Sequence, residues 1–180
     1  MKSTNRPKKK PSFIKKWAGK LHLWFGLFIG TIIFIVSITG ALYVFKDEFE
    51  NIVRKDVIYH NEKNIENKQV LPIRQLEKLV NEQTQEKYPI HWVNIPIEAE
   101  RSYQFWWYEH DVNTWNYFDE FPIYKQAYVI PYSGEVLRLY DEKNSFFNIV
   151  KMIHWSFLLK QDWGTYVVGI PVIIFVFMLI

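Results

Sequence analysis

Two long runs of apolar residues, separated by a mixed region, dominate the hydropathy pattern of the chain. Residues 21–45 contain no Asp, Glu, Lys or Arg, and about 20 apolar residues suffice for a helix to cross a bilayer. Residues 163–180 form a second uncharged run, which would cover about 27 Å as a helix. The pattern predicts two α-helical transmembrane spans, the second of them truncated, and indicates the N-terminal fragment of a longer polytopic chain.

The region between the two runs, residues 46–144, has the pattern of an α+β domain. Apolar residues recur at helical spacing behind Pro72, which favours an amphipathic helix of about three turns. Runs rich in β-branched and aromatic residues then predict strands at 91–97, 102–108, 123–130 and 135–140. The sequence Pro-Tyr-Ser-Gly at 131–134 predicts a β-hairpin between the last two. We therefore expect a helix packed on an antiparallel sheet, inserted between the two spans.

Aromatic residues are dense in the second predicted strand and the segment that follows it. Alternation along residues 102–108 would place Trp106 on one face of the sheet and Phe105 and Trp107 on the other. We expect most of these rings to form core and membrane-facing surface. The alternative is a docking surface for an aromatic or chelate ligand. Residues 145–162 have a helical apolar face and are expected to form either an interfacial helix or the start of the second span.

Charge is divided unevenly along the chain. Eight basic residues precede residue 21, and no acidic residue occurs before Asp47. Short basic flanks stay in the cytoplasm, so residues 1–20 are expected to form a basic cytoplasmic arm and residues 46–144 to be extracytoplasmic. Such an arm beside a span indicates contact with the lipid bilayer rather than with nucleic acid. A cleaved signal peptide is the alternative, but its apolar part is typically about 7–15 residues.

The first candidate for chemistry is His22, one residue inside the first apolar run. An ionisable side chain in such a place is a functional-site hypothesis by default. Gly26 and Gly30 follow on nearby turns, where they would let another helix or a flat cofactor approach the backbone. Neutral imidazole is an axial ligand of haem iron. His22 is therefore either a haem ligand or an interfacial polar residue beside an aromatic-belt Trp24, and the spacing favours neither.

The second candidate is His154, near the predicted outer surface, whereas His22 is near the inner one. At about 1.5 Å of rise per residue, the two are roughly a membrane thickness apart and cannot ligate one iron. If both bind haem, there are two haems at two depths, each with a partner histidine from another helix. Taken alone, His154 fits an interfacial residue better than a ligand.

The remaining sequence offers no other catalytic signal. His60, His91 and His110 are joined by no metal-ligand spacing, so we expect surface or core roles for them. Nucleophile-elbow, Walker, dinucleotide-binding and zinc-protease motifs do not occur, and no catalytic residue is assigned. The absence of cysteine excludes disulfides, cysteine-ligated iron–sulfur clusters, thiolate-ligated haem and c-type haem attachment.

Three segments carry a family resemblance. Lys-Trp at 16–17 precedes His-Leu-Trp-Phe-Gly-Leu at 22–27. The hairpin region 127–137 reads Ala-Tyr-Val-Ile-Pro-Tyr-Ser-Gly-Glu-Val-Leu, and Ile-His-Trp-Ser-Phe-Leu-Leu at 153–159 leads into the second run. In this order the segments resemble the PepSY-associated transmembrane (PepSY-TM) family of bacterial inner-membrane proteins. The chain departs from the family at Ile130, where an Asp is usual, so its hairpin would depend on Ser133 and Gly134.

The resemblance implies a haem-b oxidoreductase of the inner membrane that reduces ferric siderophores or other ferric chelates during iron uptake. It makes His22 and His154 axial ligands to haem iron and implies an electron donor, either a quinol or a cytoplasmic reductase. The alternative is a non-enzymatic, membrane-anchored PepSY module that binds or regulates an extracytoplasmic partner protein. An iron-uptake component without redox activity is a third interpretation.

Overall fold

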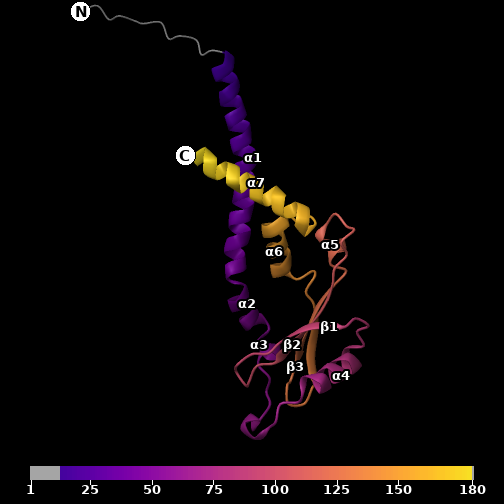
Figure 1. Ribbon diagram of the computed structural model, residues 1–180. Helices are drawn as coiled ribbons and strands as arrows, with labels where there is room; N and C mark the ends of the chain where they lie inside the picture. The colour runs from indigo at the N-terminus through magenta and orange to yellow at the C-terminus, as the bar shows by residue number, and fades with distance from the viewer. Residues whose placement is uncertain (1–12, 180) are drawn as a thin grey trace, which may run out of the picture.

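The computed structural model describes residues 13–179. It begins with one long helix, α1 (Phe13–Val44), which continues into the short helices α2 (Lys46–Val53) and α3 (Lys55–Ile58). Figure 1 shows α1 leading away from the sheet and crossed by α7 (Gln161–Leu179). Along the chain, the four-stranded sheet and α6 (Phe146–Ser156) come between these two helices. Helices α1, α6 and α7 contact one another.

Helices α1 and α7 are both long and apolar enough to cross a membrane, over Lys15–Val44 and Gln161–Leu179. Large apolar side chains such as Phe34 and Phe177 are exposed on them, at 65% and 73%. Exposed apolar surface on this scale indicates contact with lipid or with other helices. Helix α1 starts at Phe13 rather than near residue 21, because lysines are good helix formers and continue the helix beyond the apolar run. Of the expected basic arm, residues 1–12 lie outside the described residues.

The domain between the spans is an antiparallel sheet covered by one helix, as the pattern predicted. The strands are β1 (Ile90–Asn94), β2 (Tyr103–Glu109), β3 (Ile123–Val129) and β4 (Val136–Asp141), hydrogen-bonded in chain order. Strand β1 is shorter than expected because the chain leaves the sheet before Pro96, which has no N–H for the ladder. The remaining short elements are η1 (Ile65–Asn67) and α5 (Tyr117–Glu120).

Helix α4 (Ile73–Thr84) closes the core of this domain. Its Leu76 and Val80 are fully buried against Phe105 and Trp107 of β2. The alternation predicted for β2 is confirmed, since these two rings lie beneath α4 while Trp106 stacks with Trp92 on the opposite face of the sheet. The face of the sheet that carries Trp92 and Trp106 is thus not covered by α4, and it lines a cavity.

The predicted hairpin is confirmed between β3 and β4. Gly134 has a φ of +75°, a left-handed conformation that glycine adopts without steric cost. A Cβ there would lie 2.4 Å from Cδ1 of Leu79. The Ser133 hydroxyl accepts a hydrogen bond from the N–H of Glu135 at 3.3 Å. The turn therefore forms although Ile130 stands where the family usually has an Asp.

Helix α6 ends before α7 begins, so residues 145–162 are not a continuous extension of the second span. Phe157 and Leu158 both have positive φ, 54° and 60°, and they turn the chain back. Helix α7 then passes close to the end of α6, because a Cβ on Gly164 would lie 2.2 Å from Cβ of Ser156. Two small residues are therefore what allow this crossing.

Candidate functional site

His154 is held between α6 and α1 by the backbone of α1. Its Nδ1 lies 2.9 Å from the carbonyl oxygen of Val36 and 3.4 Å from the hydroxyl of Thr39. A carbonyl oxygen can only accept, so Nδ1 carries a proton, and in the neutral ring Nε2 keeps its lone pair. Gly40 makes room for the ring, since a Cβ there would lie 2.8 Å from Cε1. The contacts of Nδ1 thus orient the imidazole, and Nε2 is the ring nitrogen that keeps a lone pair.

His22 has a different environment from His154. It is exposed on α1, and so is Trp24, at 70%. Gly26 faces α7, with Met178 Cε 3.7 Å from the position of an added Cβ, whereas Gly30 has open space beside it. The structure does not bring His22 and His154 together, because His154 packs at Gly40, about 27 Å along α1 from His22 at the usual helical rise.

Within residues 13–179, no three His, Cys, Asp or Glu side chains gather where they could hold a bare metal ion. The two candidate histidines differ in the room that they would leave for a haem. Gly30 has open space beside it on the part of α1 that carries His22, whereas the His154 ring packs on Gly40, with Nε2 3.7 Å from the position of an added Cβ. A histidine that binds a metal usually donates its other ring N–H to a carboxylate, a backbone carbonyl or a water molecule. The Nδ1–H of His154 has such a partner in the carbonyl of Val36.

The other three histidines have structural partners. His60 contacts the carbonyl oxygen of Ala99 through Nε2 at 3.1 Å, and the His91 ring meets Tyr108 edge-on. His110 Nε2 lies 3.0 Å from Oε1 of Glu120. The linear spacing does not predict this last pair, because nine residues lie between its two members.

Glu120 joins the sheet domain to the second apolar helix. Its side chain is 1% exposed, and Oε2 accepts a hydrogen bond from the N–H of Gln161, the first residue of α7, at 2.9 Å. Backbone bonds from Tyr117 N–H to Leu158 and from Lys160 N–H to Trp115 complete the junction. The start of α7 is therefore fixed to the domain rather than loosely tethered.

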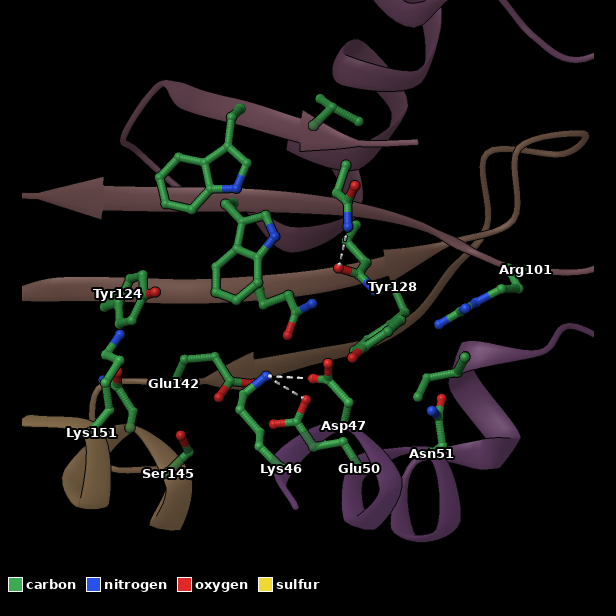
Figure 2. Close-up of a pocket in the computed structure, with 18 of the residues that line it drawn as sticks. Lys46, Asp47, Glu50, Asn51, Arg101, Tyr124, Tyr128, Glu142, Ser145 and Lys151 are labelled. Carbon is green, nitrogen blue, oxygen red and sulfur yellow. Dashed lines mark hydrogen bonds and ion pairs between the residues drawn. The ribbon is translucent and has the colours of Figure 1, made fainter. Parts of the chain in front are cut away.

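A cavity lies against the sheet face opposite α4. It has a volume of about 630 Å³, within the range of small-molecule sites. Figure 2 shows it between β1–β3 on one side and the helices α2 and α6 on the other. Its wall combines stacked indoles, amides and charged side chains: Trp92, Trp106, Asn94, Gln104, Gln126, Lys46, Glu50, Glu142 and Lys151.

Most charges around this cavity are paired. Lys46 Nζ lies 2.9 Å from Glu50 Oε2 and 3.6 Å from Asp47 Oδ1. Burial opposes the charge on Lys46, but the hydrogen bond to Glu50 and the negative charges of Glu50 and Asp47 together outweigh it and raise the pKa of Lys46. Arg54 pairs with Glu142, and both are largely buried. Burial again opposes the charge, and the hydrogen bond to Glu142 raises the pKa of Arg54 well above its ordinary value.

Lys151 is the exception among these cations. Its ammonium lies 5.5 Å from the ring centre of Tyr124 and 5.6 Å from that of Trp155, and it has no ion pair with any carboxylate in residues 13–179. Burial, helped by the nearby charge of Lys46, lowers the pKa of Lys151. The density of aromatic residues around Trp106 predicts a docking surface only as an alternative. Linear spacing cannot locate the rest of this cavity, because its residues come from α1, α2, α3, β1, β2, β3, α6 and the loops beside them.

The chain was also compared with known proteins. Residues 20–180 match the model of the family described as the PepSY-associated TM region, which covers both apolar helices and everything between them. Among curated proteins, none matches the chain.

Proposed function

We propose that this chain, which belongs to the PepSY-associated TM region family, is the electron-carrying part of a haem-b oxidoreductase in a bacterial inner membrane. The observation that supports this most is the His154 imidazole, whose Nδ1 is engaged by the Val36 carbonyl at 2.9 Å. That contact selects the tautomer in which Nε2 can donate to iron.

In this proposal His154 and His22 are axial ligands at two depths. The Val36 carbonyl would hold the ring of His154 in one orientation. Gly30 has open space beside it on α1, which would leave room for a macrocycle near His22, whereas Met178 of α7 lies beside Gly26. A bound haem b would supply reversible one-electron redox chemistry.

The substrates follow from the proposed orientation. With the basic flank inside, electrons from a quinol or a cytoplasmic reductase would leave at the face that carries residues 46–144. A ferric siderophore or another ferric chelate there would gain one electron. Reduction to Fe(II) weakens binding by hard oxygen ligands, so the metal would be released for uptake.

The test is the visible spectrum of the full chain, purified after expression with added haem. We expect a Soret band and reduced α and β bands after dithionite. His22→Ala and His154→Ala should each remove part of the haem, and His91→Ala, with its ring on Tyr108, should remove none. A colourless wild-type protein, or equal haem content in all three variants, would contradict the proposal.

A second function has one observation in its favour. The chain after the edge strand β1 exposes apolar side chains, with Ile95 at 51% and Ile97 at 100%. An exposed edge of this kind can pair with another chain. The chain would then be a membrane-anchored module that binds or regulates an extracytoplasmic protein. Site-specific cross-linking from position 97 in cells tests this, and it predicts one discrete adduct that survives His22→Ala.

A further inference from the structure

The unpaired ammonium of Lys151 lies in a cavity where other hydrogen-bond donors also lack partners. The hydroxyl groups of Tyr124 and Ser145 line the same cavity, and neither forms a side-chain hydrogen bond with any residue from 13 to 179. Figure 2 shows Tyr124, Lys151 and Ser145 grouped at one end of the cavity. Burial and the negative charge of Glu142 raise the pKa of Tyr124 to about 12, so its phenol keeps its proton at neutral pH.

The start of helix α6 adds to the positive character of the end of the cavity that holds Lys151. Ser145 is the residue before the first turn of α6, and its side chain does not cap the helix. The unsatisfied N–H groups of a helix start favour negative charge. Lys46 and Arg54 are already paired with Glu50 and Glu142, so Lys151 is the cation left without a counter-ion.

A flat aromatic wall leads from this end into the cavity. The Tyr124 ring lies 5.5 Å from that of Trp106, which is stacked on Trp92 at 5.4 Å and 17°. Trp92 is 43% exposed. Such indole faces favour another planar ring, and the amides of Asn94 and Gln104 beside them can bind polar substituents.

We propose that this cavity binds a small planar organic anion, with its carboxylate on Lys151, Tyr124 and Ser145 and its ring against Trp106 and Trp92. One ammonium and two hydroxyl groups suit the single negative charge of a carboxylate. The site is independent of the haem proposal, because it contains neither His22 nor His154.

The test is calorimetric titration of the full chain in detergent with 2-naphthoate, against 2-naphthalenemethanol as the neutral match and detergent alone as the blank. We expect 2-naphthoate to bind at least tenfold more tightly than the alcohol. Equal affinities, or no binding of the acid above the blank, would overturn the proposal without any variant being made.

Variants then assign the site. Lys151→Gln should weaken 2-naphthoate binding at least tenfold and leave the alcohol unchanged, and Lys151→Arg should restore most of the affinity. Trp92→Leu should weaken both compounds. Lys78→Gln, on the exposed face of α4 with a side chain 77% exposed, is the matched control and should change neither. Unchanged binding of the acid in Lys151→Gln would overturn the assignment.

Discussion

The carboxylate of Glu120 accepts a hydrogen bond from the backbone N–H of Gln161 at 2.9 Å, and so connects the sheet domain to the first residue of the second apolar helix. The other carboxylate oxygen of Glu120 faces His110. A buried group that uses both oxygens in this way cannot be replaced by an amide without losing an acceptor.

Glu120→Gln should therefore destabilise this junction. We expect a loss of about 1–3 kcal/mol, the usual cost of leaving a buried polar group unsatisfied. Hydrogen exchange of the first turn of α7 should become faster than in the wild-type chain. Glu48→Gln, at an exposed position of α2, is the control. Equal exchange in both variants would show that the contact is unimportant.

Gly40→Ala tests the packing of His154. The added Cβ would lie 2.8 Å from Cε1 of the imidazole, so the ring must move and its bond to Val36 must lengthen. We expect thermal unfolding at a lower temperature and, if the haem proposal is correct, lower haem content. Gly30→Ala has open space and should leave thermal stability unchanged. If the two alanine variants behave alike, α1 and α6 do not meet as described.

Gly134→Ala should destabilise the β3–β4 hairpin. The residue has a φ of +75°, and the new methyl group would meet Leu79 at 2.4 Å. Strain in a left-handed conformation costs about 1 kcal/mol, and the clash adds to it. Chemical denaturation of the full chain, followed by circular dichroism at a strand wavelength, measures the effect. Gly134→Asn should be milder, because asparagine tolerates this conformation better. A smaller loss for alanine than for asparagine would contradict the assigned φ.

Lys151→Met should stabilise the chain at neutral pH by about 1 kcal/mol. Burial lowers the pKa of Lys151 below its ordinary 10.5 in the folded chain, so the unfolded chain holds more protons between the two values. The free energy of unfolding of the wild type therefore rises with pH through that window. The advantage of the methionine variant should shrink as pH is raised toward 10.5, which thermal melts at several pH values can follow. A constant advantage would indicate a cause other than charge burial.

The sequence predicted elements better than it predicted sites. Periodicity located α4, the four strands and both apolar helices, because each depends on neighbouring residues in the chain. The hairpin was predicted from Pro131 to Gly134 for the same reason. The contact of His154 with Val36 and the pair of His110 with Glu120 depend on how separate elements cross, which no spacing reveals. The role of His22 as a ligand stays a prediction.

The crossing of α7 over α6 depends on the small side chains of Ser156 and Gly164, whose Cβ positions would be 2.2 Å apart if both were present. Neither position can accept a larger residue unless the backbone separates. In related sequences these two sites should consequently co-vary or both remain small. Gly169 has nothing within 4 Å of an added Cβ, so other residues should be found at that position. The close contact between α6 and α7 would then appear in an alignment of relatives as a limit on side-chain size at positions 156 and 164.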